Sequence, residues 1–302
     1  MSSGADSLKS ILFALGANVA IAVAKFIGAA ITGSSAMLAE AIHSIADSGN
    51  QLLLILGLRH ARRPPTPDYP LGYGKAIYFW SFIVALILFS MGGLFSIYEG
   101  VHKLRHPEPL SSAWIAIVIL MFSIGAECVS LWGCIREIDK VRGDRTLWRW
   151  FRETRQSELV VVLGEDLAAL TGLVLALAAV VLSAVTGNPL FDALGSLAIG
   201  ALLIIVAIAI GIEVQGMLIG QSMELREQQA IRGFLLARDE IADVLNLITL
   251  QLGGSALVAV KVRMTETADA GTLLESINRC EQALRQAFPR IQWLFFEPDV
   301  AD

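Results

Sequence analysis

The otherwise apolar stretch "AEAIHSIADSGNQ" places two acids, a histidine and two amides within twelve positions: Glu40, His43, Asp47, Asn50 and Gln51. Because helical residues advance about 100° each, all five share one helix face about 100° wide. His43 and Asp47 are one turn apart, so an imidazole nitrogen and a carboxylate can hold one divalent cation. The alternative is a polar network that only locks helix packing. However, an ionisable group costs about 2.5–3.5 kcal/mol at the centre of a membrane helix and is usually functional there.

A second acidic pair, Glu165 and Asp166, interrupts the apolar stretch "VVVLGEDLAALTG". Adjacent helical residues point about 100° apart, so the two carboxylates cannot face one point equally well. One can bind a cation while the other contacts a neighbouring helix, water or a backbone donor. Four groups from two helices would suit a tetrahedral cation such as zinc.

The segments that carry these residues are predicted to span a lipid bilayer. Of the 302 residues, 55% are hydrophobic and only 17% are charged, and the mean hydropathy is +0.63. Soluble domains have about 45–50% apolar and about 25% charged residues, so this composition indicates an integral membrane protein. Basic residues form no cluster typical of nucleic-acid binding, and we expect no nucleic-acid partner. Six mostly apolar segments predict transmembrane helices, at residues 8–30, 36–58, 77–100, 114–133, 159–184 and 191–214.

The composition changes after residue 220. Amphipathic and alternating stretches there predict the order helix, strand, strand, helix, strand, ending in "IQWLFFEP". We therefore expect two domains, a six-helix transmembrane domain over residues 1–220 and a small α+β domain of the ferredoxin-like type over residues 221–302.

The distribution of basic residues predicts the orientation. The connections after the second and fourth spans hold eleven Lys and Arg residues, whereas the connections on the other side hold only Lys103 and Arg105. The richer side is expected to face the cytosol. With six spans, both termini and the C-terminal domain would also be cytosolic.

Several longer motifs extend the pattern over nearly the whole chain. They include "TGSSAMLAEAIHSIADSGNQLLLILGLRHARRPP", "YPLGYGKAIYFWSFIVAL", "GGLFSIYEGVHKL", "LGEDLAALTGLVLALAAVVLSAVTGNPLFDALGSLAIG" and the terminal "FFEP". Together they resemble the cation diffusion facilitator family of divalent-metal/proton antiporters, most closely the branch of vertebrate zinc transporter nine and its bacterial relatives. The resemblance implies six helices, a cytosolic metallochaperone-like domain, a homodimer and a bacterial inner-membrane location.

The resemblance also implies which residues hold the metal. Carried over by position, the family's transport site falls on His43 and Asp47 in the second span and on Asp166 in the fifth. The remaining position, one turn before Asp166, is Val162 where zinc-transporting members usually have a histidine. Glu165 can turn in as the fourth ligand, water can fill the position, or the site can sit differently.

The implied function is the export of cytosolic divalent metal, most simply Zn²⁺, in exchange for protons by alternating access. Metal ligands must lose protons to bind, and His43 titrates most naturally near neutrality. Mn²⁺, Fe²⁺ or Co²⁺ remain alternative substrates, because an oxygen-rich site tolerates them better than a histidine-rich one. A second alternative is a non-transporting regulatory subunit with a degraded site. The sequence has no HExxH motif or comparable catalytic cluster, and we expect no enzyme activity.

Other polar residues carry weaker expectations. Tyr69 and Tyr73 replace the histidines of a second family metal site, and residues 221–302 contain no histidine, so neither region is expected to bind metal. The C-terminal domain would then support dimerisation. His102 and His106 are expected in a solvated loop opposite the cytosol.

Three further residues lie in or beside the predicted spans. Lys25 is expected to extend toward an interface, and Asp192 to favour the N-terminus of its own helix. Glu127 is expected to make a helix-packing hydrogen bond, with a proton relay or a partner that supports the metal ligands as the alternatives.

Overall fold

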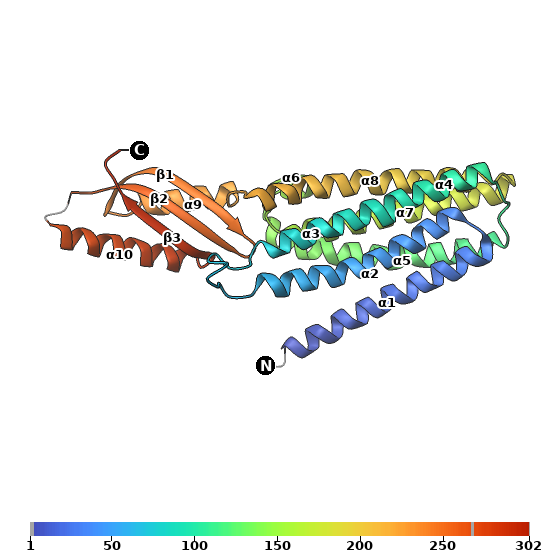
Figure 1. Cartoon of the computed structure of the whole chain (residues 1–302), viewed down its shortest axis with the longest axis horizontal. Coiled ribbons are helices and arrows are strands. Elements are labelled where there is room, and N and C mark those ends of the chain that lie inside the picture. Colours follow the sequence, from blue (N-terminus) through green and yellow to red (C-terminus); the bar gives the residue numbers. More distant parts are fainter. Residues whose placement is uncertain (1–2, 267–268, 302) are drawn as a thin grey trace. The chain divides into compact units, whose positions relative to one another are not determined.

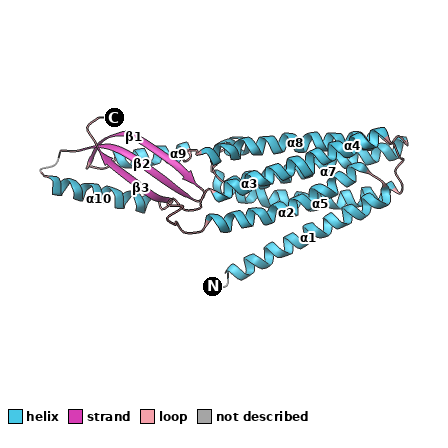
Figure 2. Cartoon of the chain, in the orientation of Figure 1, coloured by secondary structure: helices cyan, strands magenta, loops and turns pink. Residues whose placement is uncertain are grey.

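The computed structural model describes residues 3–266 and 269–301, with side chains from residue 18 onward. Helices dominate, and the strands are confined to the C-terminal part of the chain (Figure 2). The chain divides into two compact units. One is formed by Met1–Leu56, Trp80–Leu147 and Glu158–Val214, and the other by Gly57–Phe79, Trp148–Ser157 and Gln215–Asp302.

Long helices build the first unit (Figure 1). They are α1 (Ser3–Thr32), α2 (Ser35–Ala61), α5 (Ala113–Arg142), α7 (Ser157–Thr186) and α8 (Leu190–Ile219), together with α3 (Ala76–Ile87) and α4 (Phe95–Arg105). A π-helical segment, η1 (Leu88–Leu94), joins α3 to α4 without a break. Such wide turns inside helices are frequent at functional sites.

Four helical segments within the described residues are long and apolar enough to cross a membrane: Ala76–Arg105, Ala113–Arg142, Ser157–Thr186 and Leu190–Ile219. The stretch Asn18–Thr32 of α1 is apolar but shorter. Helix α2 does not reach this criterion because the polar residues of its stripe lower its hydropathy. The structure therefore supports four of the six predicted spans by length and composition.

Glycines let the helices of the first unit approach closely. A Cβ atom on Gly200 of α8 would lie 2.9 Å from the carbonyl oxygen of Gly93 in η1, and one on Gly195 would lie 2.3 Å from the Cβ of Ala179 in α7. Real side chains do not tolerate such distances, so larger residues would force the helices apart. Small residues at contacts of this kind are typical of helix packing in membranes, where lipid gives helices no hydrophobic reason to associate.

The second unit contains α6 (Leu147–Glu153), α9 (Leu225–Leu236), β1 (Ile241–Leu252), β2 (Ser255–Met264), α10 (Ala270–Ala287) and β3 (Ile291–Pro298). The element order predicted for residues 221–302 is confirmed. The three strands form one sheet in the order β1-β2-β3, antiparallel between β1 and β2 and parallel between β2 and β3. Gly253, with φ +64, allows the tight turn from β1 to β2. The parallel pair requires a crossover, which α10 provides.

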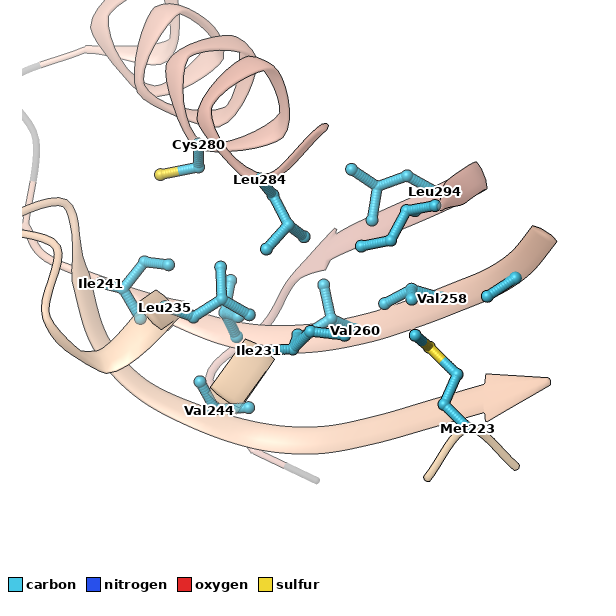
Figure 3. Close-up of a cluster of buried hydrophobic side chains, with 13 residues drawn as sticks. Met223, Ile231, Leu235, Ile241, Val244, Val258, Val260, Cys280, Leu284 and Leu294 are labelled. Atoms are coloured by element: carbon cyan, nitrogen blue, oxygen red, sulfur yellow. The ribbon is translucent and has the colours of Figure 1, made fainter. Parts of the chain in front are cut away.

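The core of this unit lies between the sheet and its helices (Figure 3). Ile231 and Leu235 from α9 and Leu284 from α10 are fully buried among the inward residues of the strands. Cys280 points into the same core, and burial raises the pKa of its thiol. Such burial is typical of a cysteine that packs as a small hydrophobic side chain.

Candidate metal site

The polar stripe of α2 faces the interior of the first unit. Glu40, His43 and Asn50 are fully buried, and Asp47 is one-fifth exposed. The Nε2 atom of His43 lies 3.4 Å from Oδ2 of Asp47, the contact expected from their one-turn spacing. Both ring nitrogens of His43 and Oδ1 of Asp47 are buried without a hydrogen-bond partner. Because most buried polar atoms are paired, this pair has free capacity to bind a cation.

The two acids of α7 are held in different ways. Asn50 of α2 donates a hydrogen bond of 2.5 Å from its side-chain amide to Oε1 of Glu165. Ser130 of α5 donates a longer one, 3.4 Å, to Oδ2 of Asp166. Glu165 is buried, whereas Asp166 is partly exposed. The adjacent carboxylates thus face different helices, as their angular separation predicts.

A cavity of about 50 Å³ joins these residues. Its wall includes four acidic side chains, those of Asp47, Glu127, Glu165 and Asp166. A concentration of carboxylates in a low-dielectric interior attracts cations strongly. The volume exceeds the space that a single water needs, so a small cation fits there.

The predicted ligands are therefore neighbours but not yet a closed site. Asp47, Glu165 and Asp166 line the cavity, and so does Val162, which has no ligating atom. His43 is not among the residues that line the cavity, but it contacts Asp47, which is. Among the residues whose side chains the structure describes, no three His, Cys, Asp or Glu side chains converge on one point closely enough to hold a metal ion. Ligation by His43, Asp47 and Asp166 would require their side chains or helices to move together.

Lys25 of α1 departs from expectation. Its side chain is only 3% exposed and lies in the wall of the cavity, rather than extending to an interface. Its ammonium donates to Oε2 of Glu40 at 3.3 Å and to Oγ of Ser44 at 2.7 Å. The reason is Glu40, whose carboxylate is completely buried and needs a compensating charge.

One glycine makes room for the stripe, and another lies beside it. A Cβ atom on Gly172 of α7 would lie 2.4 Å from Oε1 of Glu40, so any larger residue there would collide with the carboxylate. In η1, a Cβ on Gly92 would lie 3.8 Å from Nδ1 of His43. The π-helical segment therefore faces the histidine of the stripe.

Asp192 lies at the N-terminus of its own helix, as expected, but it also has a second role. It lies in the first turn of α8, but its carboxylate caps another helix. Oδ2 accepts hydrogen bonds from the backbone N–H of Ser35 at 2.7 Å and from its hydroxyl at 2.9 Å, and Oδ1 accepts one from Ser34 at 2.5 Å. The unpaired donors and positive dipole end of α2 attract it, because Ser34 and Ser35 are buried away from water.

The sequence offers Glu127 only as an alternative proton relay or partner of the metal ligands, and it does not assign Lys25 or Ser130 to the surroundings of the acids. Glu127 and Lys25 carried a signal, since each is an ionisable residue within an apolar segment. Ser130 carried none, because serine is common in packed membrane helices.

The sequence is similar to those of known proteins. Residues 11–219 match the cation efflux transmembrane domain. The chain is 33% identical over 231 residues to the mitochondrial proton-coupled zinc antiporter SLC30A9 of Mus musculus, covering 76% of this chain and 41% of that protein. The protein of the same name from Homo sapiens is 35% identical over 213 residues, covering 70% and 38%. The cation-efflux pump FieF of Klebsiella pneumoniae is 24% identical over 261 residues, covering 85% and 81%. This chain spans about two fifths of the length of the zinc antiporters.

Proposed function

The chain belongs to the cation efflux family, and from this premise we propose that it transports divalent metal cations across a membrane. Family membership makes it an integral membrane protein and groups it with transporters rather than enzymes. One observation carries the proposal: Asp47 of α2 and Asp166 of α7 line a single buried cavity, and His43 contacts Asp47 from within the same helix.

The proposed ligands are His43, Asp47 and Asp166, with Glu165 or water as the fourth. Val162 occupies the position from which a histidine would complete the site. Glu165 lines the cavity, and one of its oxygens, Oε1, accepts a hydrogen bond of 2.5 Å from the amide of Asn50, so turning in as a ligand strains or breaks this contact unless Oε2 binds the metal. Water needs no such rearrangement and can enter beside Val162, which lines the cavity.

The proposed exchange is cytosolic Zn²⁺ for protons by alternating access. The relatives named proton-coupled zinc antiporters support this choice, and so does the ligand set, because imidazole and carboxylates both bind zinc. Protons compete for the same atoms, so a proton gradient can drive metal in the opposite direction. Mn²⁺, Fe²⁺ and Co²⁺ are the alternative substrates, since three of the four candidate ligands are carboxylates.

We propose the remaining organisation from the sequence pattern. Helices α1 and α2 complete six spans over residues 1–220, and residues 221–302 form a cytosolic domain through which two copies dimerise. The excess of basic residues in the even-numbered connections supports cytosolic termini. The proposed location is a bacterial inner membrane.

The test is metal uptake into proteoliposomes that contain a metal-sensitive dye and carry an imposed pH gradient. Asp47→Asn and Asp166→Asn keep the side-chain shape but remove the charge, and each should reduce zinc flux to that of protein-free liposomes. The matched control is Asp139→Asn, which affects a partly exposed residue paired with Arg142. Native flux in both cavity variants would refute the site.

Two further results separate the alternatives. Zinc, manganese, iron(II) and cobalt supplied in parallel identify the preferred cation. If the native protein moves none of them, the regulatory alternative replaces the transport proposal, whereas stoichiometric metal binding that is lost in His43→Ala argues against a degraded site.

A further inference from the structure

A second cavity with metal-binding side chains lies beside the first turns of α2. It has a volume of about 310 Å³ and is formed by the end of α1, the start of α2, the end of α4 and the loop that follows. Its wall includes His102 and His106 from the end of α4, Glu99 one turn earlier, and Glu108 from the loop. None of these residues belongs to the proposed transport site.

His102 lies on the helix rather than in the loop that the sequence predicted, and His106 is the residue that caps the C-terminus of this helix. Helix α4 continues to Arg105, five residues beyond the predicted end of the span. The backbone N–H of His106 still donates to the carbonyl of His102 at 3.0 Å, so the helical spacing of one turn is kept. Their ring centres lie 5.0 Å apart, with the planes inclined by 36°.

This separation is the one that a shared metal ion requires. An imidazole nitrogen lies about 1.2 Å from its ring centre, and a Zn–N bond is about 2.0–2.1 Å long. With a tetrahedral angle at the metal, two bound rings have centres about 5 Å apart. The rings of His102 and His106 therefore already have the spacing of a two-histidine metal clamp.

The neighbouring groups favour a cation. Glu99 and Glu108 add carboxylates to the same wall. The ammonium of Lys103 is also in the wall, but it donates to the carbonyl of Gly33 at 2.6 Å and is thereby held at the α1–α2 connection. Tyr98 stacks on His102 with a ring separation of 6.3 Å, which restricts the orientation of that ring.

We propose that His102 and His106 form a second metal-binding site, separate from the transport site, for divalent cations that prefer imidazole. Such cations are Zn²⁺, Co²⁺, Ni²⁺ and Cu²⁺ rather than Mg²⁺ or Ca²⁺. The third and fourth ligands are water and a carboxylate of Glu99 or Glu108 after side-chain rotation, since no three such groups converge within the described part of the chain.

The position of this site suggests its role. Leu38 of α2 lines the same cavity, and His43 follows five residues later, about 7.5 Å along the helix. The cavity of His102 and His106 therefore lies beside the helix that carries the polar stripe. The site would raise the local metal concentration at this end of the bundle.

The experiment measures zinc stoichiometry on the full chain in detergent by equilibrium dialysis. The Asp47→Asn background weakens the proposed transport site. In that background we expect one zinc per chain to remain, and the added substitution His102→Ala or His106→Ala to remove it. His60→Ala is the matched control, because His60 lies at the end of α2 and stacks on Tyr73 instead. Unchanged stoichiometry in both histidine variants would overturn the proposal, as would equal loss in the His60 control.

Cu²⁺ provides a second measurement that does not depend on transport. Electron paramagnetic resonance of the native chain loaded with one Cu²⁺ should show coupling to two imidazole nitrogens. His106→Ala should remove one of them, while Asp47→Asn should leave the signal unchanged. Failure of the transport proposal would leave both results intact, whereas a signal unaffected by His106→Ala would refute the second site.

Discussion

The buried pair of Lys25 and Glu40 provides a quantitative test of the structure. Their charged atoms lie 3.3 Å apart, and both side chains are at most 3% exposed. At an effective dielectric constant of about 20, the attraction at this distance is about 5 kcal/mol. Lys25→Met removes it and leaves a buried carboxylate whose other oxygen, Oε1, already has no hydrogen-bond partner. Removing one partner of a buried pair typically costs about 3–5 kcal/mol.

The double variant sharpens this prediction. Lys25→Met combined with Glu40→Gln removes both charges, so the desolvation cost of the orphaned carboxylate disappears. We expect the double variant to recover most of the stability lost by Lys25→Met. In a double-mutant cycle the two substitutions should therefore couple by about 2 kcal/mol or more.

The assay is thermal unfolding in detergent micelles, followed by intrinsic tryptophan fluorescence. One kcal/mol shifts the midpoint by about 2–4 °C in proteins of 150–250 residues, so Lys25→Met should lower it by on the order of 10 °C. Ser44→Ala is the control, because it removes only the 2.7 Å hydrogen bond and should cost about 0.5–1.5 kcal/mol. The reasoning fails if Lys25→Met unfolds within 2 °C (~0.5–1 kcal/mol) of the native chain or if the double variant is no more stable than the single one.

Two other contacts give direct predictions. Asp192→Asn should lower the free energy of unfolding by about 1.5–3 kcal/mol, as measured in denaturant, because the side chain that caps α2 through Ser34 and Ser35 loses its charge. Unchanged stability would contradict the cap. In the second unit, the hydrogen bond from Arg238 lowers the pKa of Glu240. A lowered pKa stabilises the folded state above the unfolded pKa of about 4.3, and this contribution is lost as the pH falls through the folded value. Glu240→Gln should therefore cost at most about 1 kcal/mol at pH 7 and less as the pH falls, and an equal cost at neutral and strongly acidic pH would contradict the titration.

The helices were predictable from the sequence, but their ends were not. Apolar windows locate the part of a helix that lipid would surround. They do not detect polar turns in which the helical backbone hydrogen bonds continue beyond the apolar part. Helix α4 thus runs to Arg105 and carries His102, although its apolar stretch ends near Gly100. A residue was therefore assigned to a loop when it belongs to a helix.

The α2 stripe was also predictable, since a period of 3.6 residues puts its polar groups on one face whatever the tertiary structure. Contacts between helices were not predictable in this way. Nothing in the spacing of Lys25 and Glu40 indicates that they meet, and Asp192 is far in sequence from the helix it caps. Lys25 compensates a buried charge, and Asp192 caps an unpaired helix end. Which residue reaches each of these places depends on how the helices pack.

The arrangement of the acids bears on how metal and helix positions are linked. Asp47 belongs to α2 and Asp166 to α7, and the partner of Asp166 at 3.4 Å comes from α5. A cation held by Asp47 and Asp166 together would therefore link α2 to α7. It would also compete with the hydrogen bond that Asp166 accepts from Ser130 of α5. Among the described side chains no three ligands converge, so the arrangement seen here would bind metal more weakly than one in which His43, Asp47 and Asp166 meet. A ligand shifts a conformational equilibrium only by the difference in its affinity for the two states. Under the proposed function, that difference is the means by which metal binding would favour one helix arrangement and protonation the other.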